Sequence, residues 1–145
     1  MSALHDRVVL ITGASSGIGR ACARAFAREG CRLILAARRG ERLAALASEL
    51  SVPTLRLALD VRDKDAVERN LGTLPGEWAE VEILVNNAGL SRGLEPLDQG
   101  DPSGFEEMID TNLKGVLWVT RALLPGMRAR GRGQEIGRAS CRERV

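Results

Sequence analysis

A buried strand, a glycine-rich turn and a helix follow one another at the start of the chain, and this succession constrains the fold most strongly. Residues 7–11, RVVLI, are mostly β-branched or apolar, which is typical of a strand covered on both faces. Residues 12–19, TGASSGIG, supply the turn. Residues 19–30, GRACARAFAREG, have helical composition and end at Gly30, a plausible C-cap. A strand of this kind indicates a parallel sheet with helices on both faces.

The same alternation of strand and helix patterns continues along the chain. The expected strands are 31–37, 54–61 and 81–86, and the expected helices are 40–50, 63–74 with Asp63 as N-cap, and a long helix near 103–124 that stops before Pro125. This order predicts an α/β fold, a Rossmann-type doubly wound parallel sheet with right-handed crossovers. The sequence near residue 134 lacks the apolar pattern of a further strand. We therefore expect the sheet to be truncated after the fourth strand and the helix that follows it.

Charge and composition argue against several classes of function. The 145 residues carry a formal net charge of +2, which gives no reason to expect nucleic acid or an anionic membrane as a partner. No apolar run has the length of a bilayer span and the N-terminus lacks a signal-peptide pattern, so we expect a cytoplasmic protein. Cys22, Cys31 and Cys141 have no metal-binding or disulfide spacing, and His5 is the single histidine, so no metal site is expected.

The turn TGASSGIG has the context and spacing of a dinucleotide-binding fingerprint. Gly13 allows a tight turn, Gly17 lets the backbone approach a pyrophosphate, and Gly19 lets the helix pack close to the strand. The helix N-terminus offers N–H groups and a partial positive charge to phosphates. The candidate cofactor-binding residues of this turn are Gly13, Ala14, Ser15, Ser16, Gly17, Ile18 and Gly19. A glycine-rich turn without a ligand is the alternative.

Residues 36–39, AARR, end the second expected strand and bear on the choice of cofactor. An acidic residue is expected about twenty positions after the glycines when the cofactor carries a free ribose 2′-hydroxyl. Ala37 takes that place here and is followed by Arg38 and Arg39, whose guanidinium groups suit a 2′-phosphate. The pattern predicts NADP rather than NAD. Two solvated arginines at the start of a helix are the alternative.

The ends of the third and fourth expected strands carry polar motifs at the edge of the sheet where ligands bind. Asp60 could accept a hydrogen bond from an adenine amino group while Val61 packs on the ring, or Asp60 could simply cap a turn. Residues 86–89, NNAG, close the fourth strand. Their candidate cofactor contacts are Asn87, Ala88 and Gly89. An asparagine-rich turn is the alternative for this motif.

Asn112 lies inside the long expected helix, in the segment MIDTNLKG. Asparagine is a poor helix former because its side chain competes for nearby backbone hydrogen bonds. Its position indicates a local kink or a functional amide. An ordinary surface amide is the alternative.

Together these motifs resemble the short-chain dehydrogenase/reductase family over residues 1–134. TGASSGIG resembles its cofactor motif, LDV its adenine contact and NNAG its central-strand motif, while Asn112 matches the asparagine of its catalytic tetrad. The segments ARRGERLAAL, ILVNNAGL and MIDTNLKGVLWVTRALLPGM resemble the NADP-dependent 3-hydroxy acid (serine 3-) dehydrogenases of that family. The resemblance implies hydride transfer between NADP(H) and a small hydroxyl or carbonyl substrate, such as a 3-hydroxy acid, in a full-length homo-oligomer.

The same family uses a Ser, a Tyr general acid/base and a Lys that come after the fifth strand, and this chain contains no Tyr. Residues 135–145, EIGRASCRERV, written as codons, resemble a translated sequencing adapter. We therefore expect residues 1–134 to be the N-terminal part of an NAD(P)-binding domain and residues 135–145 to be a non-native tail, in which Ser140 is not the family's serine. The chain itself is expected to be inactive. The alternative is a non-enzymatic dinucleotide-binding module.

Overall fold

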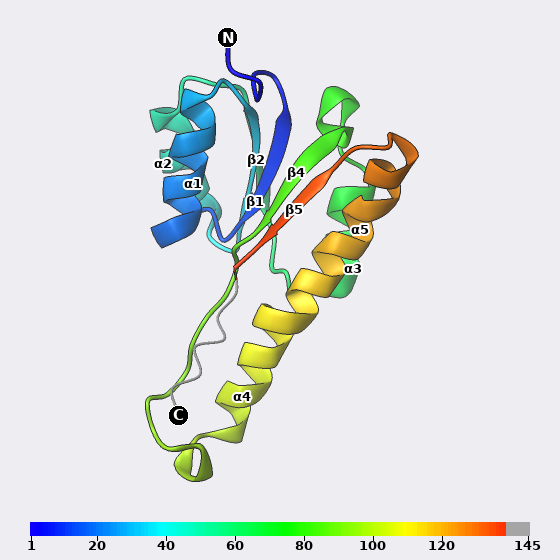
Figure 1. The fold of residues 1–145 in the computed structure, drawn as a ribbon. Coiled ribbons are helices and arrows are strands. Elements are labelled where there is room, and N and C mark those ends of the chain that lie inside the picture. The colour runs from blue at the N-terminus through cyan, green and yellow to red at the C-terminus, as the bar shows by residue number, and fades with distance from the viewer. Residues whose placement is uncertain (139–145) are drawn as a thin grey trace.

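A computed structural model of the chain, described over residues 1–138, has a parallel sheet with helices on both faces (Figure 1). The main elements are β1 (Val8–Thr12), α1 (Gly17–Arg28), β2 (Arg32–Ala37), α2 (Gly40–Glu49), β3 (Thr54–Ala58), α3 (Lys64–Gly72), β4 (Val81–Asn86), α4 (Pro102–Ile109), α5 (Gly115–Ala129) and β5 (Gln134–Gly137). The short turns are η1 (Gly76–Ala79), η2 (Leu97–Gln99) and the π-helical η3 (Asp110–Lys114), which joins α4 to α5. The strand order is β3-β2-β1-β4-β5, and all neighbours are parallel. The predicted α/β doubly wound sheet is thus confirmed.

Strand β1 lies in the middle of the sheet and contributes side chains to both of its faces. Val9 and Ile11 belong to the apolar cluster that α1 and α2 cover, whereas Val8 and Leu10 belong to the cluster that α3 and α5 cover. All four side chains are buried, so neither face of the strand needs polar residues. This explains why the sequence of β1 shows a continuous apolar run instead of an alternation.

Two predicted helix ends are present in the structure. The Asp63 carboxylate accepts a hydrogen bond from the backbone N–H of Ala66 at 3.0 Å and caps the start of α3. The Asp63 prediction is confirmed. The C-cap residue of α1 is Glu29, and the predicted Gly30 is the residue after it, with a φ of +76° that glycine adopts without steric cost.

The expectation that the sheet stops after its fourth strand is wrong, because β5 pairs with the outer edge of β4. The register runs from Ile83 opposite Gln134 to Asn86 opposite Gly137. All the residues of β5 are exposed, so backbone hydrogen bonds hold it and no apolar alternation is needed. The predicted division of the chain at residue 134 thus falls at the first residue of β5. Whether 135–145 is a non-native tail stays a prediction, and Ser140 lies outside the described residues.

Two predicted element boundaries also differ from the structure. The helix α5 does not stop before Pro125 but continues to Ala129. Proline removes only one N–H from the helix, and Leu123 and Met127, which are buried on either side of it, keep both turns packed. The third strand was expected to reach residue 61, but β3 ends at Ala58, opposite Ala37, which is the last residue of β2.

Candidate dinucleotide-binding site

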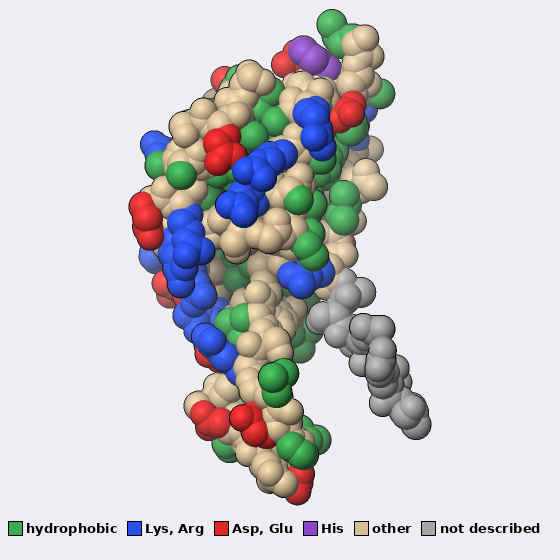
Figure 2. Space-filling view, turned by 90° about the vertical axis from the view of Figure 1, so that its left-hand side faces the viewer, with side chains coloured by type: hydrophobic (Ala, Val, Ile, Leu, Met, Phe, Trp, Pro, Cys, Tyr) green, Lys and Arg blue, Asp and Glu red, His purple; other side chains and the backbone are tan. Residues whose placement is uncertain are grey.

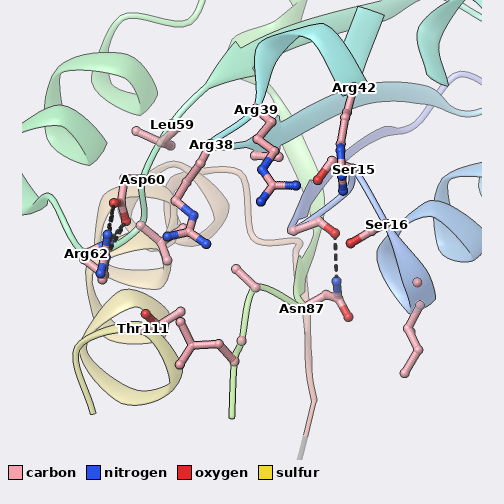
Figure 3. Close-up of a pocket in the computed structure, with 18 of the residues that line it drawn as sticks. Ser15, Ser16, Arg38, Arg39, Arg42, Leu59, Asp60, Arg62, Asn87 and Thr111 are labelled. Atoms are coloured by element: carbon pink, nitrogen blue, oxygen red, sulfur yellow. Dashed lines mark hydrogen bonds and ion pairs between the residues drawn. The ribbon is translucent and has the colours of Figure 1, made fainter. Parts of the chain in front are cut away.

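The carboxyl ends of the central strands surround a pocket of about 280 Å³ (Figure 3). The residues that line it are Gly13, Ser15, Ser16, Gly17, Ile18, Ala37, Arg38, Arg39, Arg42, Leu59, Asp60, Val61, Arg62, Asn87, Ala88, Gly89, Leu90, Thr111 and Arg138. All the predicted cofactor-binding residues are among them except Ala14 and Gly19, which are buried beneath the turn. The structure therefore brings the separate sequence motifs to one place, as expected for the carboxyl edge of a parallel sheet.

The three glycines of the β1–α1 turn differ in what a side chain would contact at each position. Gly13 has a φ of +61°, and a Cβ there would lie 2.9 Å from the Cα of Ala88. A Cβ on Gly19 would collide with the carbonyl group of Gly13, which agrees with its predicted role in close packing. Gly17 has a φ of +53° and nothing within 4 Å of such a Cβ. Its predicted contact with a pyrophosphate stays a prediction, but the space for that approach exists.

Hydrogen-bond donors at the start of α1 face the same pocket. Ser16 is the N-cap residue of α1, yet its side chain makes no capping hydrogen bond within the described part of the chain. Ser15 and Ser16 both line the pocket, together with Gly17 at the first position of the helix. The free N–H groups and the dipole of this helix end favour a negatively charged ligand.

Three arginine side chains extend into the pocket from the end of β2 and the first turn of α2 (Figure 3). Arg38 and Arg39 were predicted from the sequence, whereas Arg42 was missed. Arg42 comes three residues after Arg39 and four after Arg38. Residues at these spacings lie on the same face of a helix, and this signal could have revealed Arg42. Among residues 1–138, none of the three guanidinium groups forms an ion pair. They are therefore available to a ligand anion.

The surface around the arginines is also basic. Figure 2 looks onto the side of the molecule that carries α1 and α2, and it shows Lys and Arg side chains gathered in a band. Exposed basic residues on this side are Arg20, Arg24 and Arg28 of α1 and Arg38, Arg39 and Arg42 near the pocket. The electrostatic field at this side of the molecule thus favours the approach of anions.

Opposite these arginines, Asp60 is held by Arg62, a residue that the sequence analysis missed. The Arg62 side chain donates from Nη2 to Asp60 Oδ2 at 2.7 Å and from Nε to both carboxylate oxygens at 3.1 Å. The backbone N–H of Arg62 also donates to Asp60 Oδ1 at 3.0 Å. Hydrogen bonds from the Arg62 guanidinium lower the pKa of Asp60 below its ordinary value, so the carboxylate is ionised at neutral pH.

Val61, next along the chain, is almost wholly buried and belongs to the cluster under α5. It lies so close to Gly115 that a Cβ on that glycine would be 2.6 Å from Val61 Cγ2. The predicted packing of Val61 against an adenine ring stays a prediction.

Thr12 links the two central strands beneath the pocket, a role that the sequence analysis did not predict. Its hydroxyl oxygen accepts hydrogen bonds from the backbone N–H groups of Asn87 at 3.0 Å and Ala88 at 2.9 Å. The Asn87 side chain donates in turn to the carbonyl oxygens of Thr12 and Gly13, both at 3.2 Å. The Asn87 Oδ1 atom is buried and has no hydrogen-bond partner among the described residues. It could accept a hydrogen bond from a ligand.

Asn112 sits in the π-helical turn η3, which interrupts the α-helix at the position where a kink or a functional amide was predicted. Its Nδ2 donates to the carbonyl oxygen of Leu90 and its Oδ1 accepts from the N–H of Leu90, both at 2.8 Å. Asn112 does not line the pocket itself, but Leu90 does. The amide therefore fixes the backbone that follows the NNAG motif, and it is not an ordinary surface side chain.

Within residues 1–138, no helix combines the length and apolar character needed to cross a bilayer. The same residues contain no cluster of three or more His, Cys, Asp or Glu side chains that could hold a metal ion.

Comparison with known proteins agrees with this geometry. Residues 7–142 match the family model described as short chain dehydrogenase. The chain is 47% identical over 129 residues to the NADP-dependent 3-hydroxy acid dehydrogenase of Salmonella typhi, covering 89% of this chain and 52% of that protein. It thus spans about half the length of the curated relatives that it matches.

Solved structures give the same assignment. The closed form of serine dehydrogenase complexed with NADP⁺ is 45% identical, with a TM-score of 0.84 over 90% of this chain and 52% of that one. A metagenomic short-chain oxidoreductase in complex with NADP is 32% identical, with a TM-score of 0.90 over 99% of this chain and 67% of that one. The strand order, the glycine turn and these matches agree, and the chain belongs to the short chain dehydrogenase family.

Proposed function

We propose that the chain binds NADP(H) in this pocket as the cofactor-binding part of an oxidoreductase. The observation that carries the proposal is the group of Arg38, Arg39 and Arg42, which have no ion-pair partner among residues 1–138 and face the N-terminal end of α1. Guanidinium groups suit a ribose 2′-phosphate, and no carboxylate stands at the end of β2 to favour a 2′-hydroxyl. The bound cofactor would supply the hydride donor or acceptor.

Each group of pocket residues has a matching part of the cofactor in this proposal. The N-terminal end of α1, with Ser15 and Ser16, binds the diphosphate. The arginines bind the 2′-phosphate, and the carboxylate of Asp60 accepts from the adenine amino group. The buried Oδ1 of Asn87 accepts from a hydroxyl or amide of the ligand. Asn112 holds the backbone at Leu90 in place beside the ligand.

The reaction that we propose is hydride transfer between NADP(H) and the hydroxyl or carbonyl group of a small 3-hydroxy acid such as serine. The support for this substrate class is the naming of similar proteins as 3-hydroxy acid dehydrogenase and serine dehydrogenase. We further propose that the 145-residue chain binds the cofactor without catalysing turnover, because the family's general acid/base is a Tyr and this chain has none.

Calorimetric titration with NADPH and NADH tests the cofactor proposal. The double variant Arg38→Ala/Arg39→Ala should bind NADPH at least about 100-fold more weakly, since a hydrogen bond between charged groups contributes about 1.5–3 kcal/mol and two arginines are removed. Its affinity for NADH should change by less than about three-fold, because NADH lacks the 2′-phosphate. Arg28→Ala is the matched control, an exposed arginine at the far end of α1. Equal losses for both cofactors would contradict the assignment.

A non-enzymatic dinucleotide-binding module is the second candidate, favoured by the absence of Tyr from the chain. Sequencing the source gene across codon 134 separates the two. A frame that continues into a Ser and a Tyr-x-x-x-Lys motif supports the dehydrogenase. A frame that encodes EIGRASCRERV and then stops supports the module.

A further inference from the structure

The Asp60 carboxylate accepts most of its hydrogen bonds from one neighbouring residue, Arg62. An ionised carboxylate has about four acceptor positions. Arg62 supplies donors from its backbone N–H, Nε and Nη2, with Nε shared between the two oxygens. Arg62 thus donates three protons through four contacts, two on each oxygen, and a carboxylate with about four acceptor positions can still accept about one more proton. Because Asp60 lines the pocket, a ligand can reach the remaining position.

Arg62 is itself held from its other side. Its Nη1 lies 3.5 Å from Oε1 of Glu107 on α4. Glu107 is fixed in turn by Arg92, which donates from Nε and Nη2 to its two oxygens, both at 2.8 Å. Asp60, Arg62, Glu107 and Arg92 thus form a continuous chain of ion pairs. This chain restrains the Arg62 guanidinium, and with it the direction in which the Asp60 oxygens point.

We propose that Arg62, backed by Glu107, is a positioning residue that makes Asp60 selective for a purine with an exocyclic amino group. The inference rests on the proposed function, because it concerns the base of the cofactor bound in the same pocket. The single open acceptor position of Asp60 receives one N–H of the amino group. A base with a carbonyl at that place would bring an oxygen against the carboxylate, where neither partner has a proton to donate.

The ionisation of Asp60 supports this reading. Hydrogen bonding from Arg62 lowers the pKa of the carboxyl, and the charge of Arg38 acts in the same direction. A protonated carboxyl could donate to a carbonyl and would lose the selectivity, whereas an ionised one only accepts. Arg62 therefore supplies the orientation that the discrimination requires, and its hydrogen bonds further favour the ionised form.

The test compares two cofactors that differ only in the base, NADPH and its hypoxanthine analogue, in which a carbonyl replaces the amino group. Calorimetry on the full 145-residue chain gives the ratio of the two dissociation constants. A destabilised variant weakens both ligands by the same folded fraction, so the ratio does not respond to a purely structural defect. Arg69→Gln is the matched control, since Arg69 is exposed on α3 and outside the pocket lining.

We expect the wild-type chain and Arg69→Gln to prefer NADPH by about ten-fold or more, the range of a hydrogen bond to a charged group. Arg62→Gln should lower this ratio to less than about three-fold. Arg62→Lys should lower it nearly as far, because lysine keeps the charge but not the planar fork. Glu107→Gln should lower it by a smaller factor.

Four results would overturn the inference. A full ratio in Arg62→Gln would show that Arg62 does not position Asp60, and a full ratio in Arg62→Lys would show that charge alone suffices. A wild-type chain that binds NADPH and the analogue equally would show that Asp60 does not recognise the amino group, while the proposed function would stand. A wild-type chain that binds neither would overturn the proposed function as well.

Discussion

Replacing Thr12 by Val should destabilise the fold strongly although it hardly changes the volume of the side chain. Thr12 is 2% exposed, and its hydroxyl oxygen is the acceptor for the N–H groups of Asn87 and Ala88. Valine fits the end of a strand, so the backbone of β1 has no reason to move. The N–H of Asn87 keeps a second acceptor, the carbonyl oxygen of Val85 at 3.0 Å, whereas the N–H of Ala88 loses its partner. An N–H without a partner in the interior costs about 1–3 kcal/mol, so we expect the free energy of unfolding to fall by about that amount.

Urea unfolding followed by circular dichroism measures this loss, with two variants that isolate its cause. Thr12→Ser keeps the hydroxyl and removes one methyl group, so it should cost only about 1 kcal/mol. Thr73→Val removes a hydroxyl that is exposed and bonded to the carbonyl of Arg69, so it should change stability by less than about 0.5 kcal/mol. The reasoning is refuted if Thr12→Val unfolds within about 0.5 kcal/mol of the wild type, or if Val and Ser cost the same.

Three more predictions use the same unfolding assay. Asn112→Ala should lower stability by about 1–3 kcal/mol, because it removes two hydrogen bonds to a half-buried backbone; an unchanged midpoint would refute this. Gly19→Ala should cost more than about 2 kcal/mol, because its Cβ would meet the Gly13 carbonyl; a loss below about 0.5 kcal/mol would contradict the tight packing. Since the pKa of Asp60 is lowered in the fold, its stabilising effect should be full above the ordinary value of 3.8 and disappear as pH falls through the folded-state pKa. The stability difference between wild type and Arg62→Gln should therefore shrink on acidification, and a constant difference would count against it.

The sequence was sufficient to predict an element where burial imposed an apolar pattern on its residues. The fourth strand was expected over 81–86, and β4 is Val81–Asn86, because its apolar run is packed between two layers of helices. The fifth strand was missed because its four residues are all exposed, and it is joined to β4 by backbone pairing and by the hydrogen bond from Asn86 Nδ2 to Glu135 Oε1. Pro125 suggested a helix end because the local rule carries no information about the buried neighbours Leu123 and Met127.

Some residues of the candidate site could likewise be predicted from the sequence and others could not. Gly13 and Asp60 could be predicted, because each belongs to a motif at a turn or at the end of a strand. Arg62 follows only from the folded geometry, because a basic residue in a turn is ordinarily solvated. Arg42 has a helical spacing from Arg38 and Arg39, but the fold is needed to show that it lines the pocket. Thr12 was visible as part of a motif, but its bonds to Asn87 depend on two strands that meet across 75 residues of sequence.

The central place of β1 has a consequence for the order in which the molecule assembles. On a ribosome β1 and β2 emerge early and can pair, yet the other edge of β1 waits for β4, whose residues come 73 positions later at the Thr12–Val85 contact. Closing so long a segment is entropically costly, and contacts of this range slow folding. The glycine turn and Asn87 meet only in that late step. We therefore expect the ability to bind a nucleotide to appear in the same kinetic phase as the burial of the sheet centre, and not before it.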